Sequence, residues 1–166
     1  MKKILAFLLV LMPVFSLASS MAVSSEVDYV LVMKAERKMF LMRSGVPVKE
    51  YPISLGLSPV GHKVFEGDMR TPEGVYVLDW RNAHSSFYKS IHISYPNPDD
   101  VARALAIGKS AGGMIMIHGL PSNKKNLDEK LLLESDWTEG CIAVSNQAME
   151  EIWNSVADGT PIVILP

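Results

Sequence analysis

Cysteine is nearly absent from this sequence of 166 residues, which contains only Cys141 and therefore cannot form a disulfide within the chain. The N-terminus nonetheless resembles that of an exported protein, and exported proteins usually pair their thiols. A single cysteine in such a protein indicates an intermolecular disulfide or a reactive thiol, whereas a buried, inert thiol is the ordinary alternative. The residue types around Cys141 indicate which of these possibilities applies.

Blocks of like charge and long apolar runs are also missing. The sequence has 16 basic and 18 acidic side chains, a net charge of −2, and no basic stripe, so binding to duplex nucleic acid is not expected. The apolar run from Ile4 to Phe15 is shorter than the roughly 20 residues of a spanning helix. No second long run follows, and we expect no membrane span once the leader is removed.

The N-terminus has the features of a secretory signal peptide. Lys2 and Lys3 precede the apolar run, and Ser16-Leu17-Ala18 places small residues at a cleavage site, with Ser20-Met21-Ala22 as a second option. We expect residues 1–18 to be removed and residues 27–166 to form one domain in the periplasm or cell envelope. An uncleaved membrane anchor is the alternative.

Short strand-like runs separated by turn signals cover most of the remaining sequence. A helix is expected after Asn97, which can cap it, with Pro98 at its first position. Gly56 to Gly74 is a long Gly- and Pro-rich loop, and such loops in compact domains are usually functional or disordered. The pattern predicts a β-rich α+β fold, a sandwich or barrel with appended short helices. The expected strands are 27–33, 38–42, 46–55, 75–80, 91–95, 114–117, 142–144 and 161–165, and the other helices are 126–133 and 147–156.

The surroundings of Cys141 favour a reactive thiol. Gly140 leaves room beside the sulfur and permits a tight turn, so the backbone N–H groups of Gly140 and Cys141 are candidate donors to an oxyanion. A cysteine nucleophile also needs a base, and His118 follows an apolar strand and precedes Gly119. Adjacent strands would bring the two side chains together.

Three ordered motifs carry a family resemblance. "MIHG" (116–119) followed by "TEGCIAVSN" (138–146) resembles the active-site signature of the L,D-transpeptidases of the YkuD-domain family. "GDMRTPEGVY" (67–76) and "SIHISYPNPDD" (90–100) are similar to upstream segments found in the family or a subset of it. The resemblance extends over roughly residues 27–166 and implies an L,D-transpeptidase-like, β-sandwich catalytic domain.

The resemblance also implies the chemistry. Cys141 would attack the diaminopimelate carbonyl of a peptidoglycan tetrapeptide donor, release D-alanine and pass the acyl group to an amine acceptor, with His118 moving the proton. No metal and no cofactor would be needed. Thr138, Gly140 and Gly119 would shape the site, and Trp137 and Asn146 would contact substrate. In the long loop, Arg70, and Lys63 as a weaker candidate, could bind the substrate carboxylate, with a solvated loop as the alternative. His92 is a further candidate to bind substrate, with a surface histidine as the alternative.

Two positions depart from the family pattern. Ala143 stands where most members have arginine, and Glu139 replaces a common histidine before Gly140. A carboxylate beside the thiol would raise the thiol's pKa. Resolution of the thioester by water would make the protein an L,D-hydrolase that cleaves peptidoglycan or lipoprotein–peptidoglycan links, and a non-catalytic wall-binding module is a further alternative. A zinc site of Cys141, His118 and His92 has spacings unlike the usual metal motifs.

Overall fold

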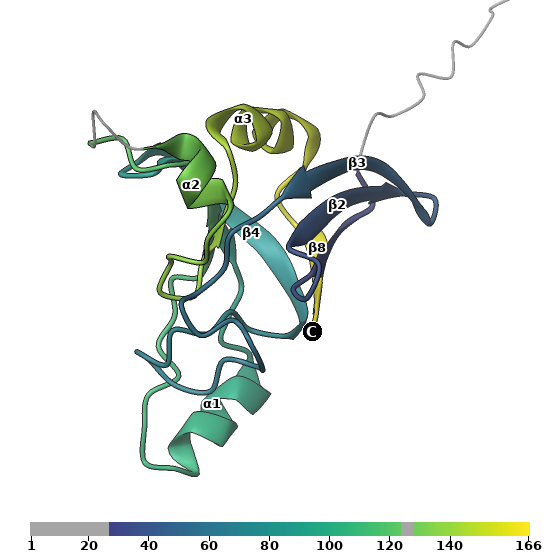
Figure 1. Ribbon diagram of the computed structural model, residues 1–166. Helices are drawn as coiled ribbons and strands as arrows, with labels where there is room; N and C mark the ends of the chain where they lie inside the picture. Colours follow the sequence, from purple (N-terminus) through teal and green to yellow (C-terminus); the bar gives the residue numbers. More distant parts are fainter. Residues whose placement is uncertain (1–26, 124–127) are drawn as a thin grey trace, which may run out of the picture.

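Eight strands join in one mixed sheet in the computed structural model, which describes residues 27–123 and 128–166 (Figure 1). The strands lie in the order β3-β2-β1-β8-β4-β5-β6-β7. The expected signal peptide and the first two residues of the helix expected over 126–133 lie outside the described residues.

The first half of the sheet contains the three strands expected at the start of the domain. β1 (Tyr29–Met33), β2 (Lys38–Arg43) and β3 (Val46–Pro52) pair antiparallel in order, and β8 (Thr160–Leu165) runs parallel to β1. Alternate residues of β1 and β8, such as Val30 and Ile162, are fully buried, as expected when one face of a sheet covers a core.

The second half of the sheet contains the site. β4 (Gly74–Ser85) pairs antiparallel with both β8 and β5 (Tyr88–Ile93), which in turn pairs with β6 (Met116–His118), and β7 (Ile142–Ala143) lies parallel to β6. β4 extends beyond the predicted end at Trp80. The polar residues that follow remain in the strand because side chains such as Arg81 bind neighbouring structure: its guanidinium donates to the carbonyls of Trp153 and Val156.

The two edges of the sheet meet. The segment after β3 forms isolated bridges with the β7 side of the sheet, Ser54 with Ala143 and Gly56 with Thr138. The sheet therefore curls round a core that includes Ile53 and Leu55, both almost completely buried. This arrangement confirms the predicted β-rich α+β fold with short helices. The two layers expected of a sandwich are parts of one sheet that closes on itself.

Three short helices accompany the sheet. α1 (Pro98–Leu105) begins at Asn97, whose side chain accepts from the Asp100 N–H in a capping box, as the sequence predicts. α2 (Glu129–Leu133) precedes the site, and α3 (Asn146–Ser155) is capped by Ser145 and packs Met149 and Ile152 into the core. No helix within the described residues has the length and apolar character needed to cross a bilayer.

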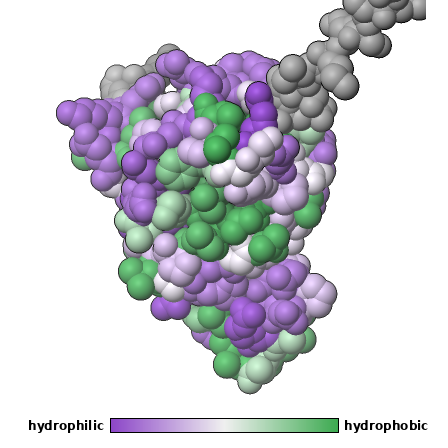
Figure 2. Space-filling model, turned by 90° about the vertical axis from the view of Figure 1, so that its right-hand side faces the viewer, coloured by the Kyte–Doolittle hydropathy of each residue, from purple (hydrophilic) through white to green (hydrophobic). Residues whose placement is uncertain are grey.

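The outward face of the sheet is only partly polar. Val75 and Val77 on β4 and Leu165 on β8 are exposed. Figure 2 shows an apolar area in the middle of one face of the molecule, with more polar surface above and below it.

Candidate active site

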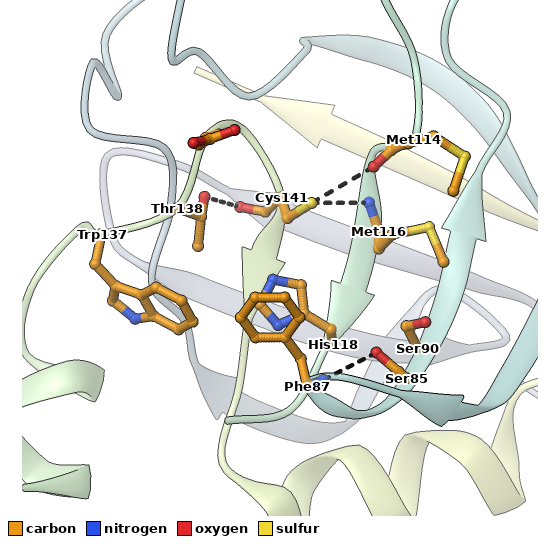
Figure 3. A pocket seen from close by; sticks show the side chains of 10 residues that line it. Ser85, Phe87, Ser90, Met114, Met116, His118, Trp137, Thr138 and Cys141 are labelled. Atoms are coloured by element: carbon orange, nitrogen blue, oxygen red, sulfur yellow. Dashed lines mark hydrogen bonds between the residues drawn. The ribbon is translucent and has the colours of Figure 1, made fainter. Parts of the chain in front are cut away.

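The register of β6 and β7 brings Cys141 and His118 to one face of the sheet. Ile117 lies opposite Ile142 in this parallel pair, and both are completely buried in the core. Side chains alternate along a strand, so the residues on either side, His118 and Cys141, project from the opposite face. Figure 3 shows the two side chains on neighbouring strands, facing the same space.

That space is a cavity of about 350 Å³. Cys141 is half-buried on its wall. Much of the remaining lining is aromatic or apolar, so the cavity suits an extended substrate with apolar portions. The lining residues are Ser85, Phe87, Ser90, Met114, Met116, His118, Trp137, Thr138, Glu139 and Cys141.

The His118 ring is held in one orientation and one tautomer. Its Nδ1 lies 2.7 Å from the Gly119 carbonyl oxygen, which can only accept, so Nδ1 carries the proton and Nε2 keeps its lone pair. The ring centroid lies 4.6 Å from that of Phe87 and 5.7 Å from that of Trp137. Burial lowers the pKa of His118, partly offset by the bond to Gly119. The imidazole is therefore neutral and able to accept a proton.

The Cys141 thiol is held close to the backbone of the β6 side. Its sulfur lies 3.4 Å from the Met116 nitrogen, which donates to it, and 3.6 Å from the Met114 carbonyl oxygen, which accepts from the thiol (Figure 3). Burial raises the pKa of Cys141 and the Glu139 carboxylate adds to this, whereas the Met116 N–H and the Lys63 charge act in the opposite direction. The resting pair is thus a neutral thiol beside a neutral imidazole.

The turn before Cys141 requires glycine. Gly140 has a φ of 130°, and a Cβ added there would lie 2.5 Å from the Arg70 carbonyl oxygen. The Thr138 hydroxyl fixes the turn, because it accepts from the Gly140 N–H at 3.1 Å and donates to the Cys141 carbonyl at 2.7 Å.

This turn corrects one sequence-based expectation. The Gly140 N–H is already bonded to Thr138, so it is not available as an oxyanion donor. Among the described residues no protein acceptor takes the Cys141 N–H, which leaves that group as the backbone donor beside the sulfur.

Trp137, Gly119 and Asn146 lie where they can shape the site, though in different ways. Trp137 lines the cavity. The Asn146 Oδ1 accepts from the Leu120 N–H at 2.8 Å, and a Cβ at Gly119 would lie 2.5 Å from that same oxygen. Asn146 therefore holds the segment that follows His118, and the expected contact between Asn146 and substrate is not seen in the cavity lining.

Arg70 and His92 do not line the cavity. The Arg70 guanidinium lies beside Gly61, and the residue approaches the site only through its carbonyl, which packs on Gly140. His92 Nδ1 lies 2.7 Å from Asp79 Oδ1, and its ring stacks on Trp80. Local packing directs both side chains away from the cavity that contains Cys141, and a contact of either residue with substrate stays a prediction.

A second cavity, of about 210 Å³, is also lined by Cys141. It shares Met114, Glu139 and Cys141 with the first cavity and adds Lys63 and Glu66. Lys63 is 3% exposed, and its Nζ lies 2.9 Å from Asp68 Oδ1. The sequence offered little sign of this cavity, because its lining comes from three separate segments of the chain.

No group of three or more His, Cys, Asp or Glu side chains within residues 27–123 and 128–166 is arranged to hold a metal ion. The chemistry that the arrangement can support is that of a thiol nucleophile with an adjacent base.

Comparison with known proteins agrees with this arrangement. The YkuD family model, which describes the L,D-transpeptidase catalytic domain, matches residues 27–164. A comparison with curated proteins finds no match. The helical cell shape determining protein Pgp2 from Campylobacter jejuni is 30% identical, with a TM-score of 0.62, and the match covers 82% of this chain and 46% of that one.

Two further solved structures share the fold. Bd1075 from Bdellovibrio bacteriovorus is 25% identical with a TM-score of 0.57, over 84% of this chain and 48% of that one. An L,D-transpeptidase from Mycobacterium tuberculosis H37Rv is 16% identical with a TM-score of 0.53, over 83% and 57% of the two chains. This chain spans about half the length of the first two proteins.

Proposed function

Because the chain belongs to the L,D-transpeptidase catalytic domain family, we propose that it is an exported cysteine acyltransferase that acts on peptidoglycan stem peptides. The observation that carries the proposal is the position of Cys141 and His118 on one face of adjacent strands, lining one cavity. The tautomer of His118 also supports the proposal. Because Nδ1 donates to the Gly119 carbonyl, Nε2 is free to accept a proton.

The first half-reaction forms a thioester. The Cys141 thiol turns from Met114 toward His118 and gives its proton to Nε2 as the sulfur attacks the diaminopimelate carbonyl of the donor tetrapeptide. The Cys141 N–H donates to the resulting oxyanion. The C–N bond to D-alanine then breaks, and the imidazolium returns the proton to the departing amine.

The second half-reaction transfers the acyl group to an amine. The acceptor nitrogen attacks the thioester carbonyl, gives a proton to His118 and displaces the Cys141 sulfur, which recovers that proton. Two cavities that both include Cys141 in their lining support a reaction with two substrates, since donor and acceptor can reach the same sulfur through different cavities. The aromatic cavity and the Lys63-containing cavity also differ in polarity, as two different ligands require.

Hydrolysis of the same thioester is the second candidate. The exposed Glu139 carboxylate lines both cavities beside the thiol, and a carboxylate can accept a hydrogen bond from a water that attacks in place of the amine. The protein would then be an L,D-hydrolase that cleaves peptidoglycan or lipoprotein–peptidoglycan links.

The decisive assay incubates a disaccharide tetrapeptide with the protein, with and without an amine acceptor, and follows the products by mass spectrometry. We expect release of D-alanine, an acyl adduct on Cys141 and an acceptor-linked product. Water-derived product alone, unchanged by the amine, would select the hydrolase. If Cys141→Ala also released D-alanine, or if wild-type protein formed neither adduct nor product, the cysteine mechanism would be wrong.

A non-catalytic wall-binding module makes a different prediction. In that case a gene that encodes Cys141→Ala would complement a deletion strain as well as the wild-type gene does. An enzyme predicts that this variant is stable yet fails to complement the deletion.

The substrate lies outside the cytoplasmic membrane, so we also infer that residues 1–18 are a cleaved leader that directs residues 27–166 to the periplasm or cell envelope. The intact mass of the protein recovered from that compartment should correspond to a chain that starts at Ser19. A mass that still includes Met1 would favour the uncleaved anchor.

A further inference from the structure

A β-bulge places two side chains of β4 opposite a single residue of β5. The register passes from Leu78 opposite Ile93 to Arg81 opposite Ile91, so that Asp79 and Trp80 together face His92. Bulges redirect side chains and are frequent next to active sites. Here the bulge explains why His92 contacts both neighbours.

The three side chains form a rigid group. The Trp80 and His92 rings are stacked, with centroids 4.7 Å apart and planes 15° from parallel. Asp79 Oδ1 lies 2.7 Å from His92 Nδ1. Trp80 is 39% exposed and the Asp79 side chain 40% exposed, whereas the His92 side chain is 13% exposed. An aromatic surface bordered by a carboxylate therefore faces solvent on a support that is already ordered.

This group lies on the same face of the sheet as the catalytic cysteine. His92 is the register partner of Met116, and Met116 lines the catalytic cavity and donates to the Cys141 sulfur. The row across the sheet therefore runs from Cys141 through Met116 and His92 to the Asp79–Trp80 bulge. Adjacent strands are about 4.8 Å apart, so three steps place the bulge about 14 Å from the cysteine.

Given the proposed function, on which this inference rests, we propose that Trp80, His92 and Asp79 form a saccharide subsite for the amino sugar that carries the stem peptide. One face of a sugar ring presents C–H groups that pack on an aromatic ring, and its hydroxyl and acetamido N–H groups can donate to a carboxylate. A site of this kind needs an aromatic surface and a few fixed polar atoms, and the bulge supplies both.

The separation fits the length of the donor. Three stem residues lie between the sugar and the bond that Cys141 attacks, and an extended chain spans about 3.3–3.6 Å per residue, or about 10 Å in all. The lactyl group that joins the peptide to the sugar adds further length. A donor lying along the row from Cys141 to Trp80 would thus place its sugar at the bulge.

Binding measurements on the full-length Cys141→Ala protein test the subsite without turnover. Calorimetry would compare a disaccharide tetrapeptide with the same tetrapeptide lacking sugar, and we expect the Kd of the sugar-bearing ligand to be lower by about tenfold. Adding Trp80→Ala should bring its Kd up to that of the sugar-free peptide, whereas Trp80→Phe should keep most of the gain. Val75→Ala, at an exposed apolar position on the same strand, is the matched control and should change neither Kd.

A second measurement does not depend on whether Trp80→Ala folds. The indole N–H resonance of Trp80, assigned by its loss in Trp80→Phe, should shift when the disaccharide alone is added. Equal affinity for the two peptides, or no shift with the disaccharide, would overturn the subsite. Failure of the proposed function looks different, because sugar-dependent binding would persist while the Cys141 protein released no D-alanine.

Discussion

The Gly140 Cα lies so close to the Arg70 carbonyl that a Cβ added to Gly140 would stand 2.5 Å from that oxygen. Backbone cannot yield as a flexible side chain can, and the φ of 130° disfavours any other residue. Arg70 therefore affects the turn before Cys141 through its main chain, although the sequence directed attention to its guanidinium.

Gly140→Ala should destabilise the protein by about 2–4 kcal/mol and abolish D-alanine release, because strain and clash both displace Cys141. Urea unfolding and the muropeptide assay measure the two effects. Gly45→Ala is the control, since Gly45 also has a positive φ but has nothing within 4 Å of an added Cβ. It should cost about 1 kcal/mol and leave activity intact. Similar losses in both variants would show that the contact with Arg70 is unimportant.

The neutral resting pair has a defined pH dependence. Burial raises the pKa of Cys141 above its usual 9.0 and lowers that of His118 below 6.5. Alkylation of Cys141 by iodoacetamide, which requires thiolate, should keep accelerating from pH 7 to beyond pH 9. Release of D-alanine should fall only below pH 6.5, as His118 becomes protonated. A plateau in alkylation below pH 7 would instead indicate a preformed thiolate–imidazolium pair.

Glu139 opposes ionisation of the thiol. Its carboxylate raises the pKa of Cys141, so Glu139→Gln should lower that pKa and speed alkylation at pH 8. The gain should stay below about tenfold and shrink in high salt, because an exposed charge is screened. Glu66→Gln, which also removes a carboxylate from the second cavity, is the control and should have a smaller effect. Equal rates for Glu139→Gln and wild type would contradict this role.

Restoring the arginine common in the family should fail in this chain. Ala143 is completely buried, and its N–H and carbonyl bond to Ser54 at 2.9 Å each. Ala143→Arg would bury a guanidinium without a counterion and should cost about 3–5 kcal/mol in the free energy of unfolding. Ala102→Arg, at an exposed position on α1, should change stability by less than about 0.5 kcal/mol. Increased activity with intact stability in Ala143→Arg would show that the site can admit the larger side chain.

The sequence could predict the central pair because local rules position it. His118 ends an apolar strand, and Cys141 follows a glycine turn that enters another strand. Both side chains therefore lie at strand ends, and pairing of the two strands brings them together. The family motifs also predicted the fold class, and the cap at Asn97 followed from side-chain chemistry alone.

Other features depend on packing between distant segments, which a single sequence does not display. Whether the Gly140 N–H can donate to a ligand depends on the orientation of the Thr138 hydroxyl, which accepts from it. The position of His92 depends on a bulge that shifts the register by one residue, and Arg70 is directed away from the cavity by the path of its loop. The strand character of residues 81–85 was masked by polar side chains, among them Arg81, whose partners lie on and after α3.

The bridges from Ser54 and Gly56 to the β7 side make the sheet a ring, and Cys141 lies where the ring closes. Residues far earlier in the chain are thus immediate structural neighbours of the sulfur's strand. A change in the segment that follows β3 therefore acts directly on the strand that carries Cys141. The geometry around the sulfur thus depends on closure of the sheet as well as on the residues next to it in the sequence.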